Sequence, residues 1–346
     1  MSLLTPDETL RQTRELWRTC FSDSEAFMDL YFSRKYTAES NVFITRGDQV
    51  VAALQAFVYP MNFYGTVVRA GYLSGVAVHP DHRGKGLASR LIDEANRRLH
   101  RAGAVMSWVI PAEEGLYDFY ERHGGYQTAA YRMDVRPDDE TEPPAADCIV
   151  EEPDDEAGEI YVCYRDIRRR TDLALCHSRE SFYTALADWR LGGHLFCTVR
   201  RRSRLTGMCF ARKDKDGTAR IYEILARDDQ SLDALVHHVR QTYADAPLYA
   251  KLSVGGNTIG AEPYAMARVL DAQRFLRAVL HANPTLTVDV GVGADRVLPD
   301  NNAYYHLADG RLSLTDVRPA TLTTSGGLAR MFLAAQAVQL KLMMDD

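Results

Sequence analysis

Gly75-Val-Ala-Val-His-Pro-Asp-His-Arg-Gly-Lys-Gly-Leu-Ala-Ser-Arg-Leu-Ile92 is the stretch that decides the fold, because a strand, a compact glycine-rich turn and a helix follow one another directly. Gly84 and Gly86 let the backbone approach an anion closely. The unpaired N–H groups and positive dipole end of the following helix favour a pyrophosphate. Arg83 and Lys85 add positive charge at the rim. The stretch therefore predicts a phosphate-binding turn.

Two common phosphate-binding motifs do not fit this turn. The Walker A motif is absent, because no glycine stands five residues before Gly84 and no Ser or Thr follows Lys85. The dinucleotide fingerprint fails as well, since Ser89 occupies the place of its third glycine and no repeating βαβ pattern surrounds the site. Coenzyme A is left as the phosphate ligand that fits best.

The flanking sequence predicts a mixed α/β unit around this turn. Helical patterns cover residues 10–20 and 24–31, and β-branched and apolar runs over residues 50–58 and 66–78 predict two strands. Apolar residues at helical spacing predict a helix over residues 87–99, and a strand, a short helix and a closing strand are expected over residues 104–110, 114–123 and 125–133. The fold class expected is α+β.

Two further regions follow an acidic stretch that is rich in proline and has no Lys or Arg, so we expect a linker at residues 137–157. The second region repeats the order of the first unit, with strands expected over 194–199, 206–211 and 219–224 and a helix over 231–243. The turn before that helix, Ala226-Arg-Asp-Asp-Gln, contains no glycine and predicts no phosphate site. The third region combines a helix over 271–280, a strand over 286–292, an Asp309-Gly310 hairpin and an apolar helix over 327–344.

Composition narrows the class of protein. With 346 residues, 46% hydrophobic and 25% charged, the chain is an ordinary globular protein of two or three domains. Its net charge of -6 argues against nucleic acid and anionic membranes as partners. The six cysteines are scattered and include no C-x-x-C pair, so we expect no metal site. No apolar stretch is long enough to span a membrane, so we expect no membrane segment. These cysteines and the absence of a signal peptide pattern favour a cytoplasmic location.

Arg83-x-x-Gly86-x-Ala88 after Val76-Ala-Val resembles the acetyl-CoA motif of the GNAT superfamily of N-acetyltransferases. A second match, Leu116-Tyr-Asp-Phe-Tyr-Glu-Arg-His-Gly-Gly-Tyr, is similar to the tyrosine-containing helix and strand beside the cofactor thiol in many of these enzymes. The resemblance implies that the acetyl-CoA site is formed by Val76, Ala77, Val78, Arg83, Gly84, Lys85, Gly86, Leu87 and Ala88.

The order of the three regions resembles the enhanced intracellular survival (Eis) family of acetyltransferases, in which two GNAT-like domains precede a domain similar to sterol carrier proteins. Pro263-Tyr-Ala-Met-Ala-Arg-Val-Leu and Leu298-Pro-Asp-Asn-Asn look like recurring segments of that last domain. The domains expected are a catalytic GNAT domain at 1–136, a GNAT-like domain without the motif at 158–261 and a sterol carrier protein-like domain at 262–346. The resemblance also implies a homo-oligomer.

The resemblance further implies roles for individual groups in a direct transfer of acetyl to a small-molecule amine or a lysine. The N–H of Val78 would bind the thioester oxygen and Tyr120 would protonate the leaving thiolate, with Tyr117 in reserve. The family uses the terminal carboxylate as the base, which here belongs to Asp346.

Several alternatives stay open at this stage. The Asp345 and Asp346 side chains, Glu113 and Glu114 are other candidates for the base. His79 and His82 in the turn are expected to have structural or solvent roles. A non-catalytic acyl-CoA sensor is the alternative function, followed by a lipid-binding protein that uses the last domain. The identity of the amine is not encoded in any motif.

Overall fold

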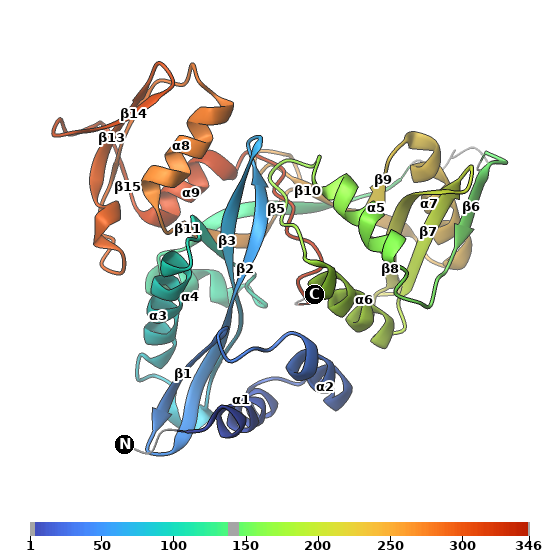
Figure 1. Ribbon diagram of the computed structural model, residues 1–346, viewed down its shortest axis with the longest axis horizontal. Coiled ribbons are helices and arrows are strands. Elements are labelled where there is room, and N and C mark those ends of the chain that lie inside the picture. Colours follow the sequence, from blue (N-terminus) through green and yellow to red (C-terminus); the bar gives the residue numbers. More distant parts are fainter. Residues whose placement is uncertain (1–3, 138–144, 345–346) are drawn as a thin grey trace.

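The computed structural model describes residues 4–137 and 145–344 and places most of their strands in one long, twisted sheet (Figure 1). This 11-stranded sheet has the order β1-β2-β3-β4-β11-β5-β10-β9-β8-β7-β6, and a 4-stranded sheet has the order β14-β13-β12-β15. Helices cover the faces of both sheets, which confirms the α+β class.

The first unit contains the elements expected from the sequence and one further strand at residues 41–46. Its elements are α1 (Pro6–Cys20), α2 (Glu25–Arg34), β1 (Asn41–Arg46), β2 (Gln49–Phe63), β3 (Thr66–Val78), η1 (Pro80–His82), α3 (Leu87–Arg101), β4 (Met106–Val109), α4 (Gly115–Gly124) and β5 (Gln127–Val135). Side-chain hydroxyl groups cap the N-termini of the first two helices. The Thr5 hydroxyl accepts from the N–H of Glu8, and the Ser24 hydroxyl accepts from the N–H of Phe27. The apolar face of α3 is buried against the sheet, as its spacing predicts.

The second unit repeats this order. It consists of β6 (Cys148–Glu151), α5 (Gly158–Arg168), α6 (Arg179–Leu191), β7 (Leu195–Arg201), β8 (Arg204–Lys213), β9 (Ala219–Ala226), α7 (Asp229–Thr242) and β10 (Leu248–Val254). Strand β10 runs parallel to β9 after α7, as β4 runs parallel to β3 after α3. The linker expected at 137–157 is shorter in the structure, because residues 148–151 form β6, which pairs with β7, and Val150 packs against the core there.

Strand β11 (Glu262–Val269) joins the two units although it comes after both in the chain. It pairs antiparallel with β4 on one side, where Met266 lies opposite Val109, and with β5 on the other. Strand β5 in turn pairs with β10 of the second unit. A strand that the sequence assigns to the third domain therefore lies in the sheet of the first unit.

The C-terminal unit contains α8 (Ala272–Ala282), β12 (Val288–Val292), η2 (Pro299–Asn301), β13 (Ala303–Ala308), β14 (Arg311–Thr315), β15 (Thr321–Thr323) and α9 (Ser325–Leu333). It lies on the opposite side of β2 and β3 from the second unit (Figure 1). The expected hairpin turn is confirmed, with positive φ at Asp309 and Gly310.

The helix expected over residues 327–344 is wrong in its second half, because α9 ends at Leu333. The following segment has a turn and then irregular backbone, with Val338 and Leu340 fully buried. Its backbone is bound by other parts of the chain: the N–H of Leu175 donates to the carbonyl oxygen of Gln339, whose own N–H donates to Leu173. Tertiary hydrogen bonds thus replace those of a helix.

No helix among the described residues has both the length and the apolar character needed to cross a bilayer.

A close contact between α1 and β3 gives the first prediction. Gly75 has φ +60°, and a Cβ atom there would lie 2.1 Å from the ring of buried Trp17. We expect Gly75→Ala to lower the free energy of unfolding by about 3 kcal/mol or more, because backbone strain adds to overpacking.

The matched control is Gly65→Ala, at φ +75° with nothing within 4 Å of the added Cβ, which should cost only about 1 kcal/mol. Urea unfolding of both variants measures the difference. Equal losses would show that the Trp17 contact is not what requires glycine at position 75.

Candidate active site

The site begins where β3 and β4 separate. The two strands pair only as far as Leu73 and Val109, whereas β3 continues to Val78 along β2. The N–H of His79 donates to Val51 on β2, so the N–H and C=O of Val78 point to the opposite side. The Val78 carbonyl there accepts from Arg83 Nε at 3.2 Å. A strand edge is thus left open toward the space beyond β4.

The glycine-rich turn leads directly from this edge into α3. Gly84 and Gly86 have φ +71° and +70°, and nothing lies within 4 Å of a Cβ at either position. Gly86 is the N-cap of α3, which has no side-chain cap and no acidic residue in its first turn. The first N–H groups of α3 are therefore available to an anion.

A cleft of about 570 Å³ joins the open strand edge to the turn. It is lined by all of the residues predicted to bind the cofactor except Lys85, namely Val76, Ala77, Val78, Arg83, Gly84, Gly86, Leu87 and Ala88. The Lys85 ammonium instead donates to the carbonyl of Asp81. The remaining wall includes Leu116 and Phe119 of α4, which lie in the tyrosine-containing motif, and Cys20 and Phe21 at the end of α1, which no local motif indicates. Burial raises the pKa of the Cys20 thiol, so it stays protonated.

Tyr120 reaches the cleft from the middle of α4. Its side chain is only 6% exposed. Burial is the main cause that raises the pKa of the phenol, and the neighbouring Tyr126 raises it further. The phenol is therefore protonated throughout the neutral range. Tyr117 is turned away, because its hydroxyl donates to the backbone oxygen of Tyr264 on β11.

The other titratable candidates are dispersed. His82 lines the cleft, whereas His79 accepts from the backbone N–H of Asp81 within the turn. Glu113 and Glu114 are exposed at the start of α4 and do not line the cleft. Within the described ranges, no group of three His, Cys, Asp or Glu side chains is placed to hold a metal ion.

The C-terminal segment is held by side chains from distant parts of the chain. Its carbonyl groups accept hydrogen bonds from Tyr264 at Leu340, from His177 at Lys341 and from Lys35 at Met343. Met344 packs against the hydrophobic cluster of Trp17, Met28, Tyr31 and Phe32. Asp346, predicted to carry the base, lies outside the described residues.

The equivalent turn of the second unit is closed to an anion by its own side chain. Asp228 is the N-cap of α7 and accepts from the N–H of Ser231 at 2.8 Å. That hydrogen bond lowers the pKa of Asp228, so the carboxylate keeps its charge. A phosphate would be repelled there.

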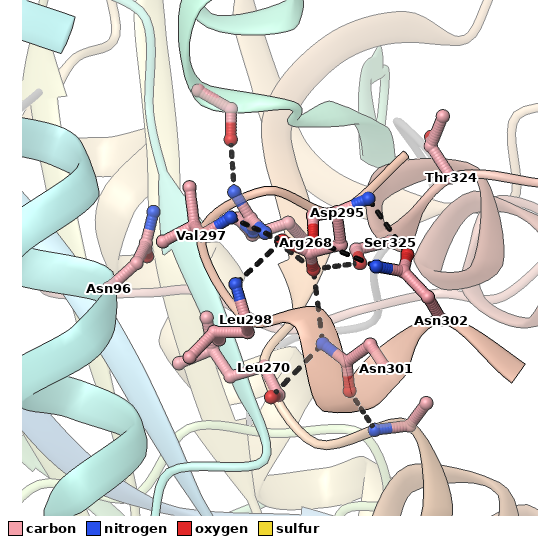
Figure 2. A network of polar contacts seen from close by, with 12 residues as sticks. Asn96, Arg268, Leu270, Asp295, Val297, Leu298, Asn301, Asn302, Thr324 and Ser325 are labelled. Carbon is pink, nitrogen blue, oxygen red and sulfur yellow. Dashed lines mark hydrogen bonds and ion pairs between the residues drawn. The ribbon is translucent and has the colours of Figure 1, made fainter. Parts of the chain in front are cut away.

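A buried polar network holds the end of α4 (Figure 2). Arg268 on β11 donates to the carbonyl of Gly124 and to Asp295, at 2.7 and 2.8 Å. Asp295 also accepts from Ser325, Asn301 and the N–H groups of the loop at residues 297–298. The C-terminal unit is thereby tied to the helix that carries Tyr120.

The fold and the cleft define the class of protein. Residues 3–129 match the family model described as acetyltransferase (GNAT) domain. The first unit is therefore similar in sequence to GNAT acetyltransferase domains. No curated protein matches the sequence.

Solved structures share the fold of almost the whole chain. A probable N-acyltransferase from Enterococcus faecalis V583 aligns with a TM-score of 0.72 at 16% identity, over 99% of this chain and 93% of that one. A GCN5-related N-acetyltransferase from Anabaena variabilis gives 0.74 at 16%, over 96% and 89%. Eis1 from Mycobacterium abscessus gives 0.67 at 14%, over 96% and 88%. At these identities the likeness concerns the fold.

The network yields the second prediction. Asp295→Asn would leave the Arg268 guanidinium buried without a counter-charge, and we expect it to lower the free energy of unfolding by about 3–5 kcal/mol. Burial alone would raise the pKa of Asp295, but the Arg268 charge and the hydrogen bonds keep it below its ordinary value. The stabilisation is therefore present above about pH 4 and is lost as the pH falls through the lowered pKa.

Asp289→Asn is the control, since Asp289 is a largely exposed partner of His306 and should contribute about 1 kcal/mol or less. Urea unfolding of the wild type and both variants from pH 3 to 7 measures the effect. A loss for Asp295→Asn no larger than that of the control would contradict it.

Proposed function

We propose that the protein is an acetyl-CoA-dependent N-acetyltransferase that transfers acetyl directly to a primary amine of a small molecule or a lysine. One observation carries the proposal: a single cleft combines an uncapped helix N-terminus behind two glycines, an open strand edge and a buried phenol. These are the parts needed to bind a pyrophosphate, orient a thioester and protonate a thiolate.

In this proposal the substrate acetyl-CoA lies along the cleft. The turn from Arg83 to Ala88 receives the pyrophosphate, and the pantetheine passes along residues 76–78. The N–H of Val78 donates to the thioester oxygen, where negative charge grows as the amine attacks. The carbon–nitrogen bond forms, the carbon–sulfur bond breaks and the thiolate takes a proton from Tyr120.

The base that removes the proton of the amine is proposed to be the carboxylate of Asp346. The carbonyl groups of Leu340, Lys341 and Met343 are each held by a side chain from elsewhere in the protein. Two residues beyond Met344 reach at most about 7 Å. Met344 packs against the hydrophobic cluster that includes Trp17, and Trp17 lies close to Gly75, the residue before Val76 of the cleft, so this distance supports the assignment.

The acceptor is proposed to enter from the side of α2 and α6. A hollow of about 200 Å³ lies there, and Phe27, Trp189, Tyr222 and Met344 are among its lining residues. The junction between α1 and α2 separates it from the cleft, because Cys20 and Phe21 line the cleft and Ser24 and Phe27 line the hollow. Aromatic walls suit a cationic amine.

The resemblance to the Eis family also supports proposals about organisation. They are a sterol carrier protein-like fold for the C-terminal unit, starting after β11, a cytoplasmic location and a homo-oligomer. The open edges of the sheets at β1, β6 and β14 offer surface for assembly.

Tyr120→Phe is the third prediction. Loss of the phenol proton should lower kcat for acetyl transfer about 100-fold or more and change the KM for acetyl-CoA little, because the ring still fills its place. Thiol release from acetyl-CoA across a panel of amines measures both constants. The raised pKa of Tyr120 means that no loss of activity from its ionisation should occur at or below its ordinary pKa of about 10.

Tyr117→Phe is the matched control. It removes a hydroxyl from the same helix, but one that points to β11, so kcat should stay within about threefold of the wild-type value. Tight binding of acetyl-CoA without turnover on any amine would favour the acyl-CoA sensor instead. Full activity of Tyr120→Phe would place the acid elsewhere.

Removal of Asp346 is the fourth prediction. We expect kcat to fall about 100-fold, with the affinity for acetyl-CoA unchanged, because the base is displaced while the cleft is intact. Asp346→Asn tests which carboxylate of that residue is the base. It removes the side-chain carboxylate and keeps the terminal one, so the variant should retain activity. Glu113→Gln and Glu114→Gln should also be active, and a loss in either would move the base to α4.

A further inference from the structure

Cys20 places a thiol in the wall of the cleft, next to the open strand edge. It is the last residue of α1, and its side chain is half-buried. The thiol donates to the carbonyl oxygen of Val78 at 3.4 Å. Because a thiol is a weak donor and Arg83 Nε donates to the same carbonyl, this contact is readily given up.

A second feature of the cleft, independent of Cys20, points to a ligand. Tyr120 lines the cleft and is only 6% exposed, and its hydroxyl has no hydrogen-bond partner among the described residues. A buried hydroxyl without a partner is unfavourable unless a ligand or water completes it. In the proposed mechanism that partner is the sulfur of coenzyme A.

The same stretch of backbone places both sulfur atoms. In the proposed complex the thioester oxygen accepts from the N–H of Val78, so the sulfur of the substrate lies beside this residue. The N–H and C=O of Val78 point to one side, away from β2, and Cys20 Sγ lies at the C=O. A change of the Cys20 rotamer moves Sγ away from the carbonyl without moving the backbone. The thiol of Cys20 therefore stands next to the position of the coenzyme A sulfur.

The reactivity of this thiol depends on what the cleft binds. Burial raises the pKa of the Cys20 thiol, and the neighbouring Arg83 opposes the rise. Since the thiolate is the nucleophile in disulfide exchange, a disulfide that only collides with the protein reacts slowly here. A disulfide held in the cleft reacts faster, because binding turns the encounter into an intramolecular step.

We propose that Cys20 is a site of reversible modification by the disulfide of coenzyme A, which blocks the cleft to acetyl-CoA. The Cys20 thiolate attacks the disulfide sulfur of the bound half of this ligand. A sulfur–sulfur bond forms to Cys20, the disulfide bond of the ligand breaks, and the other half leaves as free coenzyme A with the proton that Cys20 lost. Cys20 is oxidised and the leaving sulfur is reduced. The inference rests on the proposed function and adds redox control to it.

Peptide mass spectrometry of the full chain, incubated with coenzyme A disulfide, tests the proposal. An adduct of one coenzyme A should form at Cys20 at least about tenfold faster than at Cys148 or Cys176, the other two half-buried thiols, because only Cys20 lies in the cleft. Hydroxyethyl disulfide, which has no phosphates, should show no preference for Cys20. Acetyl-CoA should protect Cys20 alone, and dithiothreitol should remove the adduct and restore acetyl transfer.

Two cysteine variants connect the adduct to inhibition. Cys20→Ser should form no adduct in the cleft, and coenzyme A disulfide should not lower its own rate of acetyl transfer over time. Cys176→Ser is the matched control, because that thiol donates to the carbonyl of Ala174 and does not line the cleft. It should be modified at Cys20 and inhibited as the wild type is.

The opposite results distinguish this inference from the proposed function. Absence of a Cys20 adduct in a chain that binds acetyl-CoA would overturn the inference alone, and so would equal selectivity for Cys20 with hydroxyethyl disulfide. Time-dependent inhibition that persists in Cys20→Ser would overturn it too. A chain that binds neither acetyl-CoA nor coenzyme A disulfide would overturn the proposed function as well. The adduct is mapped on the wild type, so this test does not depend on the folding of any variant.

Discussion

Everything else in the molecule depends on the pairing of β11 between β4 and β5. Strand β4 has only four residues, and β11 supplies its neighbour on the side away from β3. Because β5 then pairs with β10, the strands of the first and second units form one continuous sheet. The C-terminal unit follows β11 directly, and α9 packs on β11 and β5. The three units therefore cannot be separated without breaking backbone hydrogen bonds in the sheet, and the site is built on this shared frame.

The chemistry of the cleft follows from what the frame leaves unpaired. Strand β3 extends beyond β4, so the backbone of Val78 has no neighbouring strand on the side away from β2, and α3 starts at a glycine, which has no side chain to cap it. Both features are costs for an isolated fold, because unsatisfied backbone groups are unfavourable unless water or a ligand reaches them. In the second unit the carboxylate of Asp228 removes the corresponding cost at α7. The contrast explains how one architecture can carry a ligand cleft in one copy and a closed turn in the other.

The sequence predicts the parts that depend on neighbours along the chain. The turn at Gly84 and Gly86, the amphipathic face of α3 and the Asp309 hairpin each have a local signal, and the structure contains all three. It does not predict β11 between β4 and β5, because that pairing joins residues far apart in the chain and an apolar run does not specify its partner. The helix expected to continue past Leu333 fails for a related reason: distant groups bind the backbone of that segment. The wall residues Cys20 and Phe21 lie at the end of a helix and have no motif.

The segment after α9 makes the proposed active site depend on two units of the chain and not on the first unit alone. Lys341 donates to the carbonyls of Tyr222 and Lys251 in the second unit, while its own carbonyl is held by His177. Burial lowers the pKa of His177 to about 3, so the ring is neutral and its Nε2–H donates to that carbonyl across the neutral range. Lys35 of the first unit donates a hydrogen bond to the carbonyl of Met343, further along the same segment. In the proposed mechanism, a carboxylate base beyond Met344 would thus depend on both units for its position, whereas the proposed acid Tyr120 and the proposed oxyanion donor Val78 belong to the first.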